Sequence, residues 1–343
     1  MRALAVAAIT LTVAGAAGQA RPAAPRTIIT ARGPITAFAQ DGRFLAWATE
    51  ERGRRCARMV RLRDVARGRE RVLTQADRPT CRSVARVNEL AVAAGPRGAS
   101  VLWKRFETGN FAYHWLSSAS FSEPRERDLG PVAELVHDDL RVSLAGDSSF
   151  LGYGWSHSGN GECLAGGCSY TIQKGGVTRI VAGKPAPVPA VPPTALVATD
   201  GTHLVLLVRG AVGERTKPSA PLRRVEVREA ATGRLVRALE SAGSVRGLAI
   251  DGDHVALLTA GAIELHSVAG GRQTTVAVSA RATGLSLAGT RIVFRVGRSI
   301  RLLGGGELAR AAATPIGFSL EGGRLAWAEN VKGRGRIRTL ALP

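Results

Sequence analysis

Residue types that carry acid–base, nucleophilic or metal chemistry are dispersed along this chain. The six histidines, at positions 114, 137, 157, 203, 254 and 266, fall in separate segments. His203 and His254 follow turns at equivalent positions of a repeated pattern, which indicates a feature of the repeat rather than a ligand set. The densest cluster is His137-Asp138-Asp139. It could hold a metal or act as an acid–base pair, but we interpret it as a solvated loop.

The segment Gly154-Trp155-Ser156-His157-Ser158 approaches the Gly-x-Ser-x-Gly nucleophile elbow of hydrolases. An elbow needs the second glycine and a following helix, whereas this chain has serine there and no helical pattern after it. The glycine run 304–306 is interpreted as a turn, because no helix follows it as in a phosphate-binding loop. The sequence therefore predicts no catalytic residue, no metal site and no cofactor.

The chain has four cysteines, Cys56, Cys81, Cys163 and Cys168. An even number is typical of disulfides in an exported chain. Nearest-neighbour pairing, Cys56 with Cys81 and Cys163 with Cys168, closes the shortest loops. Zinc is the alternative, but the spacing lacks the Cys-x-x-Cys pair and nearby histidine that structural zinc prefers. We therefore predict two disulfides.

The first twenty residues have the three parts of a secretory signal peptide. Met1-Arg2 is the positive start, residues 3–17 form an apolar run, and the small residues of 18–20 precede Arg21-Pro22. A membrane span needs about 20 apolar residues, so the run is too short to be one. The sequence predicts a signal peptide at 1–20, a secreted or extracytoplasmic location, and no transmembrane segment.

A short pattern recurs seven times: an apolar segment, a turn rich in Asp and Gly, and a second apolar segment. Asp-Gly between apolar strands is a strong hairpin signal, because both turn positions require positive φ. A second turn recurs downstream, starting at Ala66, Lys174, Ala231, Ala269 and Gly304. Each unit is thus a four-stranded antiparallel meander. The seven copies of the first pattern span Ala37–Trp47, Ala91–Trp103, Val142–Tyr153, Leu196–Leu207, Leu248–Leu258, Leu285–Phe294 and Phe318–Trp327.

Such units predict an all-β, seven-bladed β-propeller formed by residues 21–343 as a single domain. Six blades is the alternative if the second and third units merge. The last unit has strands only at Ile316–Leu320, Arg324–Ala328 and Arg336–Leu342. The spare strand Thr27–Ala31 can complete it and close the ring, which removes an exposed edge.

These units resemble those of exported bacterial propellers of the TolB-like and WD-repeat-like (WD40-like) superfamily, over Thr27 to Pro343. The shared features are the Asp-Gly first turns and the Thr-Gly-Arg-type third turns, so the resemblance implies a fold and not an activity. The Trp-Asp dipeptide of true WD repeats and the sialidase box are absent. No functional residue is carried over from the resemblance.

In such blades the loops between second and third strands and the blade-to-blade connections share one face. This chain places there Glu50–Arg55, Ser158–Gly167, Ala211–Leu222, Asn330–Gly335 and the proline-rich connection Gly183–Thr194. Binding residues usually lie on loops over a rigid scaffold. The candidate binding residues on this face are Arg52, Arg54, Arg55, Glu162, Arg215, Lys217, Lys332 and Arg334.

The chain has 47 Lys and Arg against 27 Asp and Glu, a formal net charge of +20. Genomic bias toward arginine codons is one explanation, and a partner of opposite sign is the other. The longest basic block is 52–55, so the clustered stripe typical of nucleic-acid binding is missing.

Two function classes follow from these observations. We favour a non-catalytic, monomeric, exported binding or scaffold module for an unknown protein or an anionic cell-envelope polymer. The alternative is an enzyme with a site in the central channel, such as a lyase or a lactonase-like hydrolase. Metal content distinguishes them, because lactonase-like propellers hold a channel ion.

Overall fold

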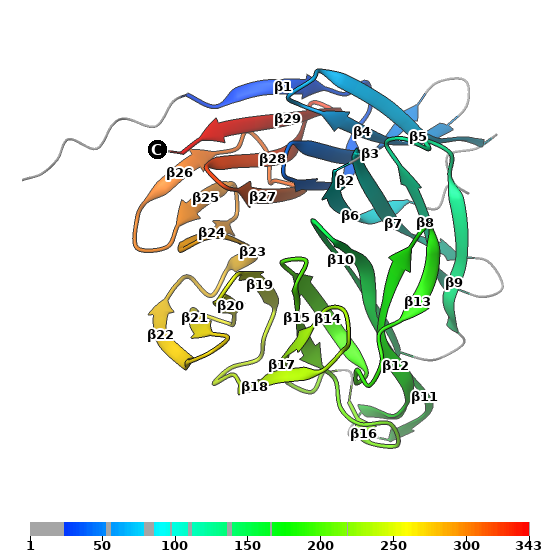
Figure 1. Ribbon diagram of the computed structural model, residues 1–343, viewed down its shortest axis with the longest axis vertical. Helices are drawn as coiled ribbons and strands as arrows, with labels where there is room; N and C mark the ends of the chain where they lie inside the picture. The colour runs from blue at the N-terminus through cyan, green and yellow to red at the C-terminus, as the bar shows by residue number, and fades with distance from the viewer. Residues whose placement is uncertain are drawn as a thin grey trace, which may run out of the picture.

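The computed structural model describes residues 24–52, 56–78, 86–96, 98–108, 112–135, 139–164, 167–217 and 219–342. The predicted signal peptide, residues 1–20, lies outside them. All regular secondary structure in these ranges is β-strand, in seven antiparallel sheets arranged around a common axis (Figure 1). The all-β class and the propeller are therefore confirmed.

The first three blades follow the chain in order. Blade 1 contains β2 (Ile35–Asp41), β3 (Phe44–Arg52), β4 (Cys56–Asp64) and β5 (Arg69–Arg78). Blade 2 contains β6 (Val87–Gly95), β7 (Gly98–Thr108), β8 (Ala112–Ser120) and β9 (Arg127–Leu135). Blade 3 contains β10 (Asp139–Asp147), β11 (Phe150–Leu164), β12 (Gly167–Val181) and β13 (Lys184–Pro187), and the short β16 (Arg215–Thr216) pairs with β12.

The remaining blades repeat this order. Blade 4 contains β14 (Thr194–Thr199), β15 (His203–Val208), β17 (Arg224–Glu229) and β18 (Leu235–Glu240). Blade 5 contains β19 (Gly247–Asp251), β20 (His254–Leu258), β21 (Ala262–Ser267) and β22 (Gly271–Ala277). Blade 6 contains β23 (Ala282–Ala288), β24 (Arg291–Val296), β25 (Ser299–Leu302) and β26 (Glu307–Arg310). Blade 7 contains β27 (Gly317–Glu321), β28 (Arg324–Val331), β29 (Arg334–Ala341) and β1 (Arg26–Thr30).

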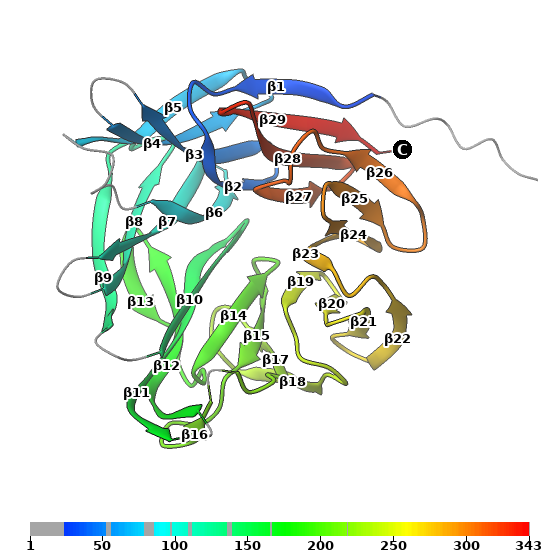
Figure 2. The ribbon, with the colours of Figure 1, turned by 180° about the vertical axis from the view of Figure 1, so that it is seen from behind.

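The first strand of every blade lies innermost and the fourth lies at the rim, as both views of the disc show (Figures 1 and 2). Blades 2 and 3 are separate sheets, so the six-bladed alternative is wrong. The core lies between neighbouring blades. Because side chains alternate along a strand, Trp47 of β3 packs toward blade 7 while Phe44 of the same strand packs toward blade 2. Both faces of each inner sheet are therefore apolar.

The N-terminal strand closes the ring, as the sequence predicts. β1 pairs with β29 as the fourth strand of blade 7, with a β-bulge between Thr27 and Ile29. The bulge explains why Ile28 and Ile29 are adjacent in a strand that should alternate: both contact the core between blades 7 and 1, and Ile29 is 7% exposed. Closure leaves no blade with a missing strand.

The seven predicted first turns all join first and second strands, whereas one predicted second turn is wrong. Residues 174–176 lie inside β12, and the third turn of blade 3 is at 182–183. A Cβ on Gly175 would lie 2.8 Å from the Cα of Pro193, so this glycine permits a close backbone approach and not a turn. The proline-rich stretch Gly183–Thr194 is also only partly a connection, because its start forms β13. Prolines are tolerated there because β13 is an edge strand.

Candidate functional site

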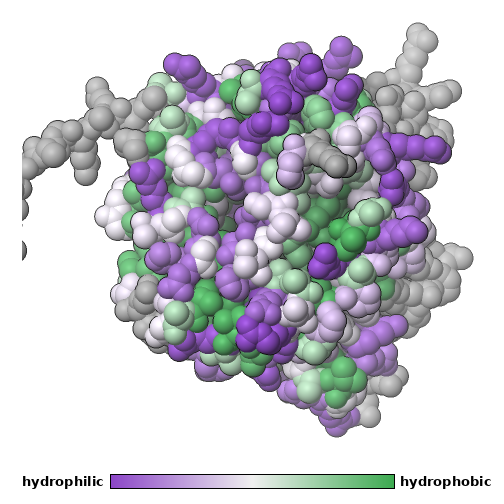
Figure 3. Space-filling model, viewed as in Figure 1, coloured by the Kyte–Doolittle hydropathy of each residue, from purple (hydrophilic) through white to green (hydrophobic). Residues whose placement is uncertain are grey.

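The disc has two different faces. In a four-stranded antiparallel blade, the first and third turns lie at one end, here named the turn face. The loops between second and third strands and the connections between blades lie at the other, here named the loop face. Figure 3 shows hydrophilic and hydrophobic residues interspersed over one side of the disc, with no single apolar patch.

On the turn face, five of the seven inner strands end at, or one residue before, a carboxylate: Asp41, Asp147, Asp200, Asp251 and Glu321. Burial raises the pKa of Asp147 to about 6, and the charges of Asp41, Asp200 and Asp251 add to the shift. Burial likewise raises the pKa of Glu321 to about 8, with Asp41 and Asp147 contributing. The first turns therefore bring their acids together around the ring axis.

These acids link one turn to the next. Asp41 Oδ2 accepts hydrogen bonds from the backbone N of Ala94 in blade 2 (2.5 Å) and of Ser148 in blade 3 (2.7 Å). In the same way, Asp251 accepts from Gly289 N at 2.5 Å and Glu321 from Gly42 N at 3.4 Å. Asp41, Asp251 and Glu321 therefore have a structural role in holding blades together.

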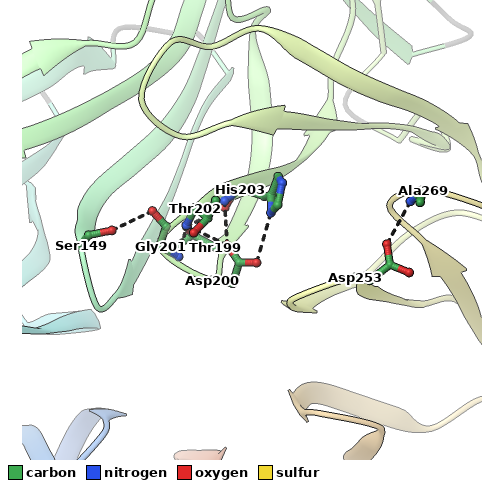
Figure 4. Close-up of polar contacts among 8 residues, drawn as sticks. All are labelled: Ser149, Thr199, Asp200, Gly201, Thr202, His203, Asp253 and Ala269. Atoms are coloured by element: carbon green, nitrogen blue, oxygen red, sulfur yellow. Dashed lines mark hydrogen bonds and ion pairs between the residues drawn. The ribbon is translucent and has the colours of Figure 1, made fainter.

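Figure 4 shows two further arrangements of these turns. Ser149 Oγ donates to the carbonyl of Gly201 at 2.9 Å, which joins blades 3 and 4. Asp200 instead stays within its own turn, accepting from the N of Thr202 and of His203 and lying 3.3 Å from His203 Nδ1. His203 and His254 both open second strands, at equivalent places as the sequence predicts.

On the loop face, a pocket of about 510 Å³ lies at the ends of the inner strands β10 and β14. The loop between β15 and β17 and the connection before β19 complete its wall. The polar lining side chains are His114, Arg141, Ser219 and Ser244. The apolar ones include Leu140, Val142, Leu196, Leu207, Leu222 and Val245. This is the candidate site, because it combines an apolar wall with few polar groups on the loop-bearing face.

His114 supplies an uncharged polar group to this pocket. Burial, with the nearby charge of Lys104, lowers the pKa of His114 to about 4, so the imidazole is neutral at neutral pH. Its ring lies 5.3 Å from that of Phe106. Lys104 itself is buried, pairs with Glu89 at 2.5 Å, and donates to the carbonyl of Val142 at 2.6 Å. Lys104 thus supports the pocket wall rather than a ligand.

Arginines stand at the loop-face ends of several inner strands. Arg86, Arg246 and Arg281 immediately precede β6, β19 and β23, and all three are exposed. Arg86 also pairs with Glu50 at 2.8 Å. Arg141 lines the pocket itself. Five inner strands thus have a carboxylate at the turn face, and three are preceded by an arginine at the loop face.

The predicted candidates that the structure describes lie at the loop-face ends of their blades, and none of them lines this pocket. Arg52 ends β3, Glu162 lies in β11, and Arg54 and Arg55 fall outside the described residues. Arg215 belongs to β16, opposite Thr171 of β12, so the blade 4 loop lies beside the long hairpin of blade 3. The exposed Lys217 lies in the same loop, and the exposed Lys332 and Arg334 lie at the turn between β28 and β29.

Sequence reasoning missed the residues of the pocket and its rim. It concentrated on the loops between second and third strands, whereas Arg86, Arg246 and Arg281 lie at the ends of connections between blades. Their signal was positional: each arginine directly precedes the first apolar strand of a unit. His114 gave no such signal, because only folding brings β8 beside the starts of β10 and β14.

The near-match to a nucleophile elbow is part of β11. Ser156 is fully buried in mid-strand, where a serine cannot reach a substrate, and Arg209 Nη1 lies 3.5 Å from its Oγ. His137 and Asp138 lie outside the described residues, and Asp139 pairs with the buried Arg209 at 2.5 Å. Asp139 therefore has a structural partner.

The disulfides remain a prediction. Cys163 and Cys168 are directly opposite each other in the β11–β12 ladder. Opposed residues of an antiparallel pair have Cα atoms about 4.5 or 5.5 Å apart, within the range that a disulfide spans. Cys56 begins β4, and Cys81 lies outside the described residues.

Across the described ranges, no group of three or more His, Cys, Asp or Glu side chains is placed to hold a metal ion. In the same ranges, no helix is long and apolar enough to cross a membrane.

Comparison with known proteins gives the fold. No family model and no curated protein matches the chain. Among solved structures, it is similar to a puromycin-hydrolysing peptidase of Mycobacterium tuberculosis, with a TM-score of 0.51 and 15% identity. The match covers 87% of this chain and 49% of the peptidase, so the chain spans about half the length of that protein. At this identity the similarity extends to the propeller fold alone.

Proposed function

We propose that this chain is an exported, non-catalytic binding or scaffold propeller that takes an anionic cell-envelope partner on its loop face. The observation that carries the proposal is the charge arrangement at the ends of the inner strands. Arg246 and Arg281 are exposed at the loop face, and so is Arg86 although it pairs with Glu50, whereas the carboxylates of the inner strands gather at the turn face. An anionic chain would therefore be attracted to the first face and repelled from the axis of the second.

The loop-face pocket supports the same proposal. Arg141, which lies 3.7 Å from the Asp139 carboxylate, adds a cation beside an apolar wall, and the neutral His114 offers a hydrogen bond without adding charge. Exposed candidates farther out, such as Arg215, Lys217 and Lys332, extend the cationic surface toward blades 4 and 7. In this proposal the pocket holds one anionic group while the rim arginines contact the rest of the polymer.

The test uses two labelled probes, linear poly-glutamate and inorganic polyphosphate, because carboxylate and phosphate are the common anionic groups of envelope polymers. Binding is followed by fluorescence anisotropy at several salt concentrations. We expect the triple variant Arg86→Glu, Arg246→Glu, Arg281→Glu to bind at least tenfold more weakly than the parent. We also expect steep weakening with salt, since exposed charges are screened beyond about 8 Å at physiological ionic strength.

The matched control reverses three cations near the turn face, Arg67→Glu, Arg69→Glu and Arg301→Glu, and so makes the same change in net charge. It should retain affinity within about threefold. Equal losses in both triple variants would mean that net charge alone drives binding, and the proposed face would be wrong. Affinity that is independent of salt would contradict an anionic partner.

Export and the disulfides belong to the same proposal and have their own experiment. Expression of the full chain with its first twenty residues should yield a monomer outside the cytoplasm, cleaved near residue 20. Non-reducing peptide mapping of that material should show Cys56 joined to Cys81 and Cys163 joined to Cys168. Retention in the cytoplasm with four free thiols would contradict both parts. Metal analysis of the same sample tests the lyase or lactonase-like alternative, which requires a bound ion.

A further inference from the structure

A second cavity, of about 520 Å³, lies between blades 2 and 3 at the turn face, far from the loops. One wall comes from β7 and β8 of blade 2. The other comes from the turn between β10 and β11 and from the end of β12 in blade 3. The volume is in the range of small-molecule pockets.

The cavity has an identifiable cause in the sequence. Phe44 lies three residues before Trp47 in blade 1, and Phe150 lies three before Tyr153 in blade 3. Both phenylalanines are 3% exposed and fill the space toward the next blade. In blade 2 the residue three before Trp103 is Ser100, which lines the cavity. A small polar side chain thus stands where the neighbouring blades place an aromatic ring.

Serine hydroxyls form the blade 2 wall. Ser100 is directly opposite Ser120 in the β7–β8 ladder, and Ser118 lies two residues from Ser120, on the same face of β8. Ser118 is 3% exposed, and in the described part of the chain its Oγ has no hydrogen-bond partner. A buried hydroxyl without a partner costs about 1–3 kcal/mol, which a bound hydrogen-bonding group would recover.

The charged groups at the rim neutralise each other. Arg127 is ion-paired with Glu123, and its Nη1 donates to the carbonyl of Ala182 at 3.0 Å, across to blade 3. Gly183 allows this approach, because a Cβ there would lie 2.5 Å from Arg127 Nη1. The cavity thus offers hydroxyls, a paired guanidinium and carboxylate, and the methyl groups of small residues such as Ala93 and Ala99.

We propose that this cavity binds a small neutral polyhydroxy compound of monosaccharide or disaccharide size. Hydroxyl groups both donate and accept, as the serines and the ion pair do, so a sugar can satisfy Ser118 and contact Arg127 and Glu123 at once. An anion would gain little, because the guanidinium already has a carboxylate partner. A cation would gain little either, because the carboxylate of Glu123 is already paired with Arg127. The site is independent of the anionic partner proposed for the loop face.

The test is ligand-observed NMR with glucose, galactose, N-acetylglucosamine and trehalose, followed by calorimetry on those that bind. Glucuronate and glucosamine serve as charged comparators. At least one neutral sugar should bind, and more tightly than either comparator. Ser100→Phe, which restores the aromatic side chain of blades 1 and 3, should abolish binding while the melting temperature is kept or raised.

A second variant keeps the proposal falsifiable if Ser100→Phe does not fold. Ser118→Ala should lower the affinity about tenfold, the loss of one hydrogen bond, without loss of stability, because the hydroxyl has no partner in the protein. The control Ser299→Ala removes a half-buried hydroxyl on blade 6, which donates to Glu307, and should leave sugar binding unchanged. The proposal is overturned if no neutral sugar binds, if a charged comparator binds more tightly, or if Ser100→Phe folds and binds as the parent does.

Discussion

Because β1 closes the ring, removing it should destabilise the protein. The contacts of this one strand allow the loss of stability to be estimated. A chain lacking residues 1–33 loses β1, whereas a chain lacking only residues 1–20 keeps it. Ile29, 7% exposed, packs with Ile35, Trp47 and Ile337 between blades 7 and 1. Truncating such an isoleucine to alanine costs about 2–5 kcal/mol.

Deleting the whole strand removes more than one side chain. It also breaks the ladder between β1 and β29 and the hydrogen bond from Ala31 N to Gly335 O at 2.8 Å. With about 1 kcal/mol for each backbone hydrogen bond, the loss approaches the 5–15 kcal/mol stability of a typical domain. At roughly 2 °C for each kcal/mol, we expect the melting temperature to fall by about 10 °C or more.

The assay is thermal unfolding by circular dichroism, with size-exclusion chromatography to detect association through the uncovered edge of β29. Ile29→Ala should lower the melting temperature by several degrees, while Thr30→Ala, at an exposed position of the same strand, should change it by less than about 1 °C. The reasoning would be refuted if the chain lacking residues 1–33 had the same melting temperature as the chain lacking residues 1–20 and stayed monomeric.

Three further predictions concern single residues. The pKa of Glu321 is raised to about 8, so between about pH 4.5 and pH 8 the folded state keeps a proton that the unfolded state has lost. Stability should therefore fall as the pH rises through this range. Melting curves at pH 5 and pH 9 should show that Glu321→Gln removes much of the fall. Ser148 has φ of 42° where five other first turns have glycine, so Ser148→Gly should raise stability by about 0.5–1 kcal/mol in urea titrations, and a loss would mean that the hydroxyl bond to Asp147 outweighs the strain. Asp139→Ala leaves the buried Arg209 without its carboxylate and should destabilise by about 3–5 kcal/mol, whereas a neutral result in the same titration would show that Arg209 is solvated.

Most of the fold could be predicted from the sequence, because the blade is specified locally. Five of the seven first turns have a glycine with positive φ, at Gly42, Gly201, Gly252, Gly289 and Gly322, and Ser148 has positive φ in the first turn of blade 3. The error in blade 3 has the same origin. Gly175 and Gly176 have the local signature of a turn, but Gly175 instead permits the close approach of Pro193, in the connection between blades 3 and 4. A turn and a close approach both require glycine, and the sequence alone does not distinguish them.

The candidate sites were harder to predict because they arise between blades. His114 and Arg141 belong to different units, and no spacing in the sequence relates them. Ser100 is different. When the units are aligned on Trp47, Trp103 and Tyr153, Ser100 occupies the position at which the other two units have a phenylalanine. A repeat protein can therefore reveal a cavity by the position at which one unit departs from its neighbours.

The same comparison separates the two roles of the first turn. The glycine serves the backbone, and the carboxylate joins neighbouring blades. Blade 6 has Ala288 where blades 1 and 5 have Asp41 and Asp251, and in blade 2 the end of β6 likewise has no carboxylate. In both cases the turn without an acid receives the acid of the preceding blade, at Ala94 N and at Gly289 N. A carboxylate in those turns would add charge to a cluster in which burial and mutual repulsion already raise the pKa of Asp147 and Glu321. Turns that have an acid of their own can also receive one, as Gly42 N of blade 1 does from Glu321. The turns of blades 2 and 6 instead join the ring through backbone N–H groups, which adds no further buried charge.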